Sequence, residues 1–181
     1  MRWRVVFVAA VLPASPLIFP ARTAAQSASA TKTLGDIGQI ALPVGAGAVA
    51  LAHRDAKGVG ELALVSATTL AVVFTLKPII NRRRPNGGNH SFPSGHTASA
   101  FMGAAFLQQR YGWAYGAPAY AAAAFVGYSR VHTKEHWTTD VLAGAALGIA
   151  SNVVFTRRFH KVQISPTAGH GGLGVSAVVA W

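Results

Sequence analysis

A histidine and an aspartate four residues apart are the first candidates for chemistry in this sequence. On a helix, His136 and Asp140 would share one face, where the carboxylate can accept a hydrogen bond from one imidazole nitrogen. The other nitrogen is then an oriented nucleophile. Asp140 is one of only five acids in the chain and lies in an apolar stretch, where an ionisable side chain indicates function. A simple polar pair within a helix is the alternative.

The tetrapeptide Pro93-Ser94-Gly95-His96 is typical of a helix start that binds an anion. Ser94 can cap the helix, and Gly95 lets a ligand approach the unpaired N–H groups at the positive end of the helix dipole. His96 would then lie at the rim of the anion site. The alternative is a capped helix whose histidine faces water.

Three cations accompany these motifs. Lys77 and Arg84 are seven residues apart, in a stretch where Pro78 and Pro85 restrict the backbone. Arg130 lies six residues before the candidate nucleophile. Taken singly, Lys77 and Arg84 are also compatible with interfacial cations whose long side chains reach towards lipid headgroups.

Together these residues resemble the three-part signature of the type 2 phosphatidic acid phosphatase (PAP2) superfamily, in its membrane-bound lipid phosphatase branch. The three parts are Lys77-(six residues)-Arg84-Pro85, Pro93-Ser94-Gly95-His96 and Ser129-Arg130-(five residues)-His136-(three residues)-Asp140. Eleven specified positions in this order and spacing are a strong signal. The resemblance covers roughly residues 34–155.

The resemblance implies that His136 attacks phosphorus to form a phosphohistidine, that Asp140 orients it, and that His96 protonates the leaving oxygen. It also implies that the phosphoryl oxygens are bound by the remaining signature residues, which are Lys77, Arg84, Ser94, Gly95 and Arg130. Neither a metal nor another cofactor is expected. The residues left without a role are Arg82, Arg83, His90, His132 and Lys134.

The composition favours a membrane protein. Of 181 residues, 51% are hydrophobic and only 12% are charged, about half the charged share of a soluble domain. Since the chain has no cysteine, disulfides, cysteine-bound metal centres and cysteine nucleophiles are excluded. The net charge of +11 comes in short clusters at the ends of apolar segments, not on a basic face with interleaved aromatics, so nucleic-acid binding is not expected.

Five apolar segments must position the candidate residues, and they predict an all-α transmembrane bundle of about five helices. The segments are 34–52, 59–76, 97–107, 113–128 and 137–155, several of them only just long enough to span a bilayer. Glycine and alanine repeat at 45–48, 103–105 and 144–148. Such groups allow helix backbones to pack closely in lipid.

The two ends of the chain differ from the bundle. Residues 1–30 are predicted to be a signal peptide, cleaved after Ala25 or Ala30, or an uncleaved signal anchor, because two arginines precede a short apolar run and then small residues. Residues 31–160 form the predicted PAP2-like catalytic domain. In the tail, residues 161–181, apolar residues alternate, which predicts a short β-hairpin.

The positive charges also predict the topology. If the first segment runs inward, residues 53–57, Arg110 and residues 157–161 are cytoplasmic, in agreement with the positive-inside rule. Loops 77–92 and 129–136 then face the periplasm. We therefore expect a multi-pass protein of the bacterial inner membrane whose active site faces the periplasm.

The expected function is hydrolysis of a lipid phosphate or diphosphate: phosphatidic acid, phosphatidylglycerol phosphate, undecaprenyl diphosphate or a lipid A phosphate. The alternatives are a soluble-type acid phosphatase or vanadium haloperoxidase of the same superfamily, and a non-hydrolytic lipid phosphotransferase or headgroup-binding membrane protein. The oligomeric state is not predicted. Two imidazoles with an ordinary pKa of about 6.5 predict a bell-shaped pH profile.

Overall fold

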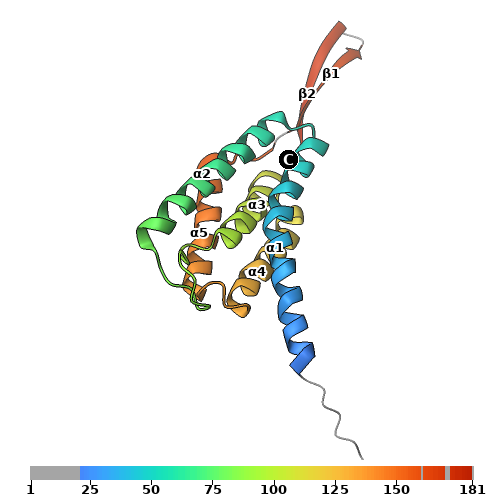
Figure 1. Cartoon of the computed structure of the whole chain (residues 1–181). Helices are drawn as coiled ribbons and strands as arrows, with labels where there is room; N and C mark the ends of the chain where they lie inside the picture. The colour runs from blue at the N-terminus through green and yellow to red at the C-terminus, as the bar shows by residue number, and fades with distance from the viewer. Residues whose placement is uncertain (1–20, 160, 170–171, 181) are drawn as a thin grey trace, which may run out of the picture.

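The computed structural model of the chain describes residues 21–159, 161–169 and 172–180, with side chains from 26 to 159. This part of the chain contains five helices (Figure 1), which are α1 (Ala21–Ala52), α2 (Ala56–Ile80), α3 (Gly95–Tyr111), α4 (Trp113–His132) and α5 (Thr138–Phe155). The prediction of a five-helix bundle is confirmed. Helices α1 to α4 each contain one predicted apolar segment and extend beyond it, whereas α5 begins one residue inside its segment and ends with it at Phe155.

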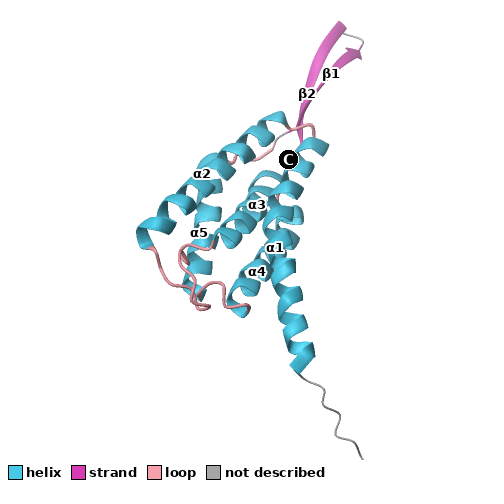
Figure 2. Cartoon of the chain, in the orientation of Figure 1, coloured by secondary structure: helices cyan, strands magenta, loops and turns pink. Residues whose placement is uncertain are grey.

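The chain continues beyond α5 into two strands, β1 (Lys161–Gly169) and β2 (Gly172–Ala180), which pair antiparallel (Figure 2). At the other terminus, the first 20 residues of the predicted signal or anchor lie outside the described residues. Residues 21–30 form the first turns of α1. The predicted domain boundaries at 30 and 160 stay predictions.

Helix α3 lies at the centre of the bundle and packs against all four other helices. Ten of its 17 residues are buried, among them Met102 and Phe106, which contact a core shared with α2 and α4. The first turn of α3 carries the predicted anion-binding tetrapeptide. The surrounding helices therefore fix the position of this turn.

Glycines let α1 and α5 approach α3 until their backbones touch. A Cβ atom at Gly103 would lie 2.7 Å from the backbone nitrogen of Pro43, and one at Gly148 would lie 2.5 Å from the carbonyl oxygen of Ala98. No side chain fits at either position, which confirms close packing at 103–105 and 144–148. A Cβ at Gly45 would meet nothing within 4 Å, so that glycine makes no such contact.

Three of the helices are long and apolar enough to cross a membrane: residues 26–52 of α1, all of α2 and all of α5, with mean hydropathies of 1.4, 1.9 and 1.4. Their outer faces expose large apolar side chains, including Ile40, Phe74 and Leu142. Such a surface is typical of contact with lipid. The protein is therefore a membrane protein; that α3 and α4 also cross the bilayer stays a prediction.

The two ends of the bundle are built differently. The long-loop end consists of residues 81–94 and 133–137, and Figure 2 shows these loops side by side. A backbone hydrogen bond joins them, from Asn86 N–H to the Lys134 carbonyl at 3.1 Å, and another runs from Ser94 N–H to the Asp140 carbonyl in the first turn of α5 at 3.0 Å. The short-turn end consists of residues 53–55, 112 and 156–159.

The two loops that carry the candidate residues thus lie at the same end, as the topology requires. They are shorter than the sequence indicates, since α2 continues to Ile80 and α4 to His132. Lys77 and Arg130 consequently lie on the last turns of helices and not in loops.

Candidate active site

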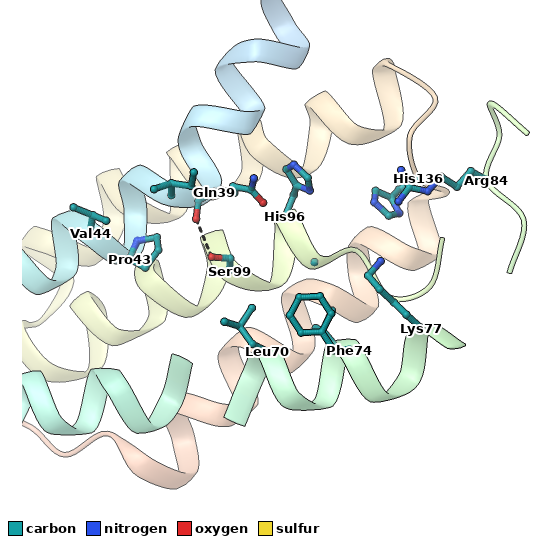
Figure 3. A pocket seen from close by; sticks show the side chains of 13 residues that line it. Gln39, Pro43, Val44, Leu70, Phe74, Lys77, Arg84, His96, Ser99 and His136 are labelled. Carbon is teal, nitrogen blue, oxygen red and sulfur yellow. Dashed lines mark hydrogen bonds between the residues drawn. The ribbon is translucent and has the colours of Figure 1, made fainter. Parts of the chain in front are cut away.

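A cavity of about 480 Å³ opens near the long-loop end, between α1, α2 and α3 (Figure 3). Five of the eight predicted site residues line it: Lys77, Arg84, Gly95, His96 and His136. The other three are buried behind this lining: Ser94, Arg130 and Asp140. The structure thus brings the three motifs to one place. Their catalytic and binding roles stay proposals.

His136 lies in the short loop before α5 and is only 2% exposed. Burial lowers the pKa of His136 to about 4, and the positive charges of Arg84 and Lys77 act in the same direction. Its imidazole is therefore neutral at physiological pH. A neutral ring nitrogen is what a nucleophile requires.

Asp140 lies in the first turn of α5, whereas His136 precedes that helix. The expectation that one helix carries both residues is therefore wrong. The Nδ1 atom of His136 and the Oδ2 atom of Asp140 are 3.9 Å apart, too far for a hydrogen bond. The carboxylate instead caps α5, since Oδ2 accepts the Trp137 N–H at 3.0 Å.

The hydroxyl of Ser91 lies between the two residues. It donates to Oδ2 of Asp140 at 2.5 Å, and its oxygen is 3.4 Å from Nδ1 of His136. Ser91 comes from the loop before α3 and is fully buried. The spacing of His136 and Asp140 gives no indication that a residue so far along the chain separates them.

Arg82 binds the second oxygen of the same carboxylate. Its NH1 group donates to Oδ1 of Asp140 at 2.8 Å and to the hydroxyl of Thr139 at 2.6 Å. Its guanidinium lies over the ring of Trp137, 5.6 Å from the centroid. Sequence reasoning left Arg82 without a role, because spacing does not reveal which residue of three adjacent arginines turns inward.

Helix α1 supplies a carboxylate that the signature does not contain. Oδ1 of Asp36 lies 3.0 Å from Nε2 of His96 and accepts a hydrogen bond from NH1 of Arg130 at 2.6 Å. Asp36, like Asp140, is one of the five acids and lies in an apolar segment. The reasoning that singled out Asp140 could therefore have found Asp36 as well.

Glu135 orients the cation Arg84. Oε2 of Glu135 accepts from NH1 of Arg84 at 2.9 Å, while Oε1 accepts from the Lys32 ammonium at 2.5 Å. Burial alone would raise the pKa of Glu135, but the Lys32 and Arg84 contacts lower it below its ordinary value. Glu135 is thus held as an anion beside the cavity. Lys77 donates only to a backbone oxygen in the described residues, the carbonyl of His90 at 2.9 Å.

The start of α3 has the predicted cap. The hydroxyl of Ser94 accepts from the backbone N–H of Thr97 at 3.4 Å and lies 3.0 Å from its side-chain oxygen. Ser94 therefore faces the helix and not the cavity, which Gly95 lines. The side chains still without a role do not line the cavity: Arg83, His90, His132 and Lys134.

The half of the cavity remote from the loops is largely apolar, although Gln39 and Ser99 also line it and the Ser99 hydroxyl donates to the Gln39 carbonyl at 2.8 Å. We call it the apolar groove; it is lined by Ile40, Pro43 and Val44 of α1 and by Leu70, Val73 and Phe74 of α2. Several of these side chains are exposed, Val44 by 63% and Phe74 by 66%. The groove therefore opens along the face of two candidate membrane-spanning helices.

This arrangement can transfer a phosphoryl group. It combines a neutral imidazole, a second imidazole beside a carboxylate, and cations around a helix N-terminus, which together can attack phosphorus, protonate a leaving oxygen and bind the phosphoryl oxygens. Among the described side chains, no three His, Asp or Glu residues converge as metal ligands. Cations provide the positive charge at the cavity instead.

Comparisons with known proteins agree with this chemistry. The PAP2 superfamily matches residues 86–164. The chain is 33% identical to the lipid A 4'-phosphatase of Helicobacter pylori strain J99, and the match covers 70% of this chain and 69% of that protein.

Two solved structures are similar in fold. The crystal structure of Aquifex aeolicus LpxE has a TM-score of 0.62 and 25% identity, covering 71% of this chain and 84% of that one. The first transmembrane PAP2 type phosphatidylglycerolphosphate phosphatase from Bacillus subtilis has a TM-score of 0.59 and 26% identity, with coverages of 77% and 78%.

Proposed function

Because this chain belongs to the PAP2 superfamily, we propose that it is a membrane phosphatase that hydrolyses a phosphate or diphosphate group on a lipid. The observation that carries the proposal is the shape of the cavity described above. Its polar half holds His96, His136 and the cations, and its apolar half opens between α1 and α2. A phosphate group and an acyl chain of the same molecule fit these two halves.

The first step forms a covalent intermediate. Nε2 of His136 attacks phosphorus, the bond from phosphorus to the lipid oxygen breaks, and His96 gives that oxygen a proton. Lys77 and Arg84 face the cavity and, with the backbone N–H of Gly95 and the guanidinium of Arg130, stabilise the charge on the three phosphoryl oxygens. We expect the proton transfer by His96 to contribute about 10²–10⁴-fold in rate.

The second step releases phosphate. His96, now neutral, takes a proton from a water molecule that attacks the phosphohistidine, and the phosphorus–nitrogen bond breaks. Inorganic phosphate leaves and His136 returns to its neutral state. These steps need only the residues at the cavity, so we expect activity without a metal.

We place a lipid A phosphate first among the substrates, because the Helicobacter pylori relative carries that substrate in its name. Phosphatidylglycerol phosphate is second, on the same ground, from the Bacillus subtilis structure. Phosphatidic acid and undecaprenyl diphosphate complete the panel. All of them join a phosphate to long apolar chains, as the cavity requires.

We further propose that the protein resides in the bacterial inner membrane with its long-loop end towards the periplasm. The short-turn end and the adjoining helix turns carry several cations, namely Arg54, Lys57, Arg110, Arg157 and Arg158. Because we assign the cations of the long-loop end to the phosphate site, the positive-inside rule supports a cytoplasmic location for the short-turn end. Residues 1–30 would then be the export signal or anchor and residues 31–160 the catalytic domain.

The test is phosphate release by the detergent-purified protein in excess EDTA, with the four lipids and an aryl phosphate as substrates. We expect release from at least one lipid, loss of release in His136→Ala, and retention in His132→Ala. His132 is a matched control because it lies at the end of α4 with its ring stacked on Tyr128.

Other outcomes would redirect the proposal. Equal signals from wild type and His136→Ala would indicate a headgroup-binding protein. Release that requires a lipid acceptor would indicate a phosphotransferase, and loss of release in EDTA would contradict a metal-free mechanism.

A further inference from the structure

We propose that Ser91 and Arg82 are positioning residues for the nucleophile: together they hold the carboxylate of Asp140 and connect it to His136. The inference rests on the proposed function, which makes His136 the nucleophile. Neither residue lines the cavity and both contact Asp140, so we assign them a role through that carboxylate and not a contact with substrate.

The carboxylate of Asp140 is fixed at both oxygens. Oδ1 accepts from Arg82, and Oδ2 accepts from Ser91 and from the Trp137 N–H. The side chain is 0% exposed, and a buried carboxylate is stable only with such donors. Apart from the imidazole of His136, Arg82 is the only basic side chain among the described residues that lies within ion-pair distance of Asp140.

The hydroxyl of Ser91 determines which nitrogen of His136 carries hydrogen. A serine hydroxyl has one hydrogen, and Ser91 directs it to Asp140 at 2.5 Å. Only lone pairs then remain to face Nδ1 of His136, which is 3.4 Å away. Nδ1 must therefore be the protonated nitrogen, and Nε2 keeps the lone pair that attacks phosphorus.

The same chain of contacts stabilises the charge that develops during the reaction. When Nε2 bonds to phosphorus, the imidazole becomes positive. The Nδ1–H group then donates towards the Ser91 oxygen, and the Ser91 hydroxyl donates to the Asp140 carboxylate, so the negative charge of Asp140 stabilises the positive ring. Ser91 and Arg82 also act as a unit, because Ser91 N–H donates to the Arg82 carbonyl at 2.8 Å. The loop thus positions the hydroxyl and the guanidinium together.

The experiment compares Ser91→Ala and Arg82→Ala with wild type on the same five substrates. We expect kcat to fall roughly 10²-fold in each, the usual effect of misplacing a reacting group by about 1 Å, with KM changed by less than about twofold. Arg82→Lys, which keeps a cation, should recover part of the loss.

Matched controls come from neighbouring positions. Arg83→Ala removes an exposed side chain that makes no hydrogen bond or ion pair within residues 26–159, and Ser151→Ala removes a hydroxyl that donates to a helix carbonyl on α5. Both should retain wild-type kcat. If Ser91→Ala fails to fold, Ser91→Thr and Ser91→Val replace it. Threonine and valine have the same shape as each other, and only threonine keeps the hydroxyl.

A double-mutant cycle separates positioning from a general structural role. In an Asp140→Asn background, Ser91→Ala and Arg82→Ala should each cost less than about threefold in kcat, because the group through which they act is already lost. A structural role would give losses that multiply.

Two results would overturn the inference: single variants that behave like Arg83→Ala, or losses that multiply with Asp140→Asn. Failure of the proposed function looks different, because wild type would then release no phosphate or His136→Ala would remain active. Either of those outcomes removes the basis of the inference as well.

Discussion

Both ends of the bundle bury an arginine, but the two arginines meet different amounts of negative charge. At the short-turn end, Arg110 donates to both oxygens of Asp55 at 2.5 and 2.6 Å and to Glu61 at 2.8 Å. Burial alone would raise the pKa of Asp55, but its hydrogen bonds with Arg110, Gly58 N–H and the Tyr111 hydroxyl lower it. Two carboxylates thus surround one guanidinium.

At the long-loop end the ratio is reversed. Asp36, Glu135 and Asp140 face five cations, namely Lys32, Lys77, Arg82, Arg84 and Arg130. Arg130 shares its one carboxylate with His96. The comparison teaches that a buried arginine stabilises the fold where carboxylates neutralise its charge. Where cations outnumber carboxylates, the excess positive charge can bind a substrate anion.

The largest expected effect is on stability at the matched end. Arg110→Ala leaves the buried carboxylate of Asp55 and the partly buried carboxylate of Glu61 without their cation, and we expect it to lower the free energy of unfolding by about 3–5 kcal/mol. Denaturant or thermal unfolding in detergent measures this. Arg157→Ala is the control, since only its backbone carbonyl contacts Arg110. Equal effects of the two variants would contradict the proposed stabilising role of the Arg110 side chain.

The matching change at the long-loop end should affect catalysis instead. Arg130→Ala is expected to lower kcat/KM by about 10²–10³-fold, as does loss of a donor that stabilises transition-state charge. Its effect on unfolding should be smaller than that of Arg110→Ala, because water can solvate the freed Asp36, which is 43% exposed. A larger unfolding effect for Arg130→Ala would break the comparison.

As pH falls, catalytic activity at the long-loop end should be lost before the stabilising contribution of Asp55 at the short-turn end. His136 must be neutral to attack, and its lowered pKa of about 4 keeps it neutral as pH falls, so kcat/KM should decline near pH 4 and not near 6.5. Asp55 has a depressed pKa, so its stabilising contribution is complete above the ordinary 3.8 and is lost below it. A pH profile of kcat/KM with unfolding midpoints at each pH tests this; an acid limb near 6.5 would contradict it.

Asp36→Asn should have a moderate effect. It removes the charge that orients His96, and we expect kcat to fall roughly tenfold, the lower range for loss of a group that positions an imidazole. Steady-state kinetics measures the change. Asp36→Glu should restore part of the rate, and full activity in Asp36→Asn would show that the contact has no part in proton transfer.

The smallest effect is expected from Glu135→Gln. Arg84 loses an ion-pair partner but remains at the cavity, so KM should change by less than about fivefold, in line with the contribution of up to about 1 kcal/mol of a partly exposed pair. Lys134→Ala is the neighbouring control. A loss of kcat larger than that of Asp36→Asn would place Glu135 in the chemistry.

Local sequence patterns predicted the five helices, but not on which side of a helix boundary each candidate residue lies: Lys77 and Arg130 are in helices, and His136 is in a loop. Apolar stretches predict helices in lipid because each must satisfy its own backbone groups. The Pro93-Ser94-Gly95-His96 tetrapeptide predicts a capped helix start, because a helix start and its first turn have nearly fixed geometry. The Ser94 cap and the glycine contacts of α3 are confirmed for this reason.

The partners of these residues could not be predicted in the same way. Ser91 and Arg82 reach Asp140 from a loop about 50 residues earlier, and Asp36 reaches Arg130 from 94 residues away. Such contacts depend on how loops fold and how helices pack, which no local spacing records. Even the His136–Asp140 pair was predicted as a direct contact, whereas a capped helix start and a serine separate them.

The sideways opening of the apolar groove has a kinetic consequence. A substrate with long acyl chains stays in the bilayer, because each buried CH₂ contributes about 0.8 kcal/mol to its retention. It then meets the protein by diffusion in two dimensions, and its concentration is its mole fraction among the lipids and not its amount per litre. Diluting the substrate with inert detergent or lipid at constant bulk concentration should therefore slow turnover, whereas diluting the whole sample with micelle composition kept constant should leave the rate per enzyme molecule unchanged.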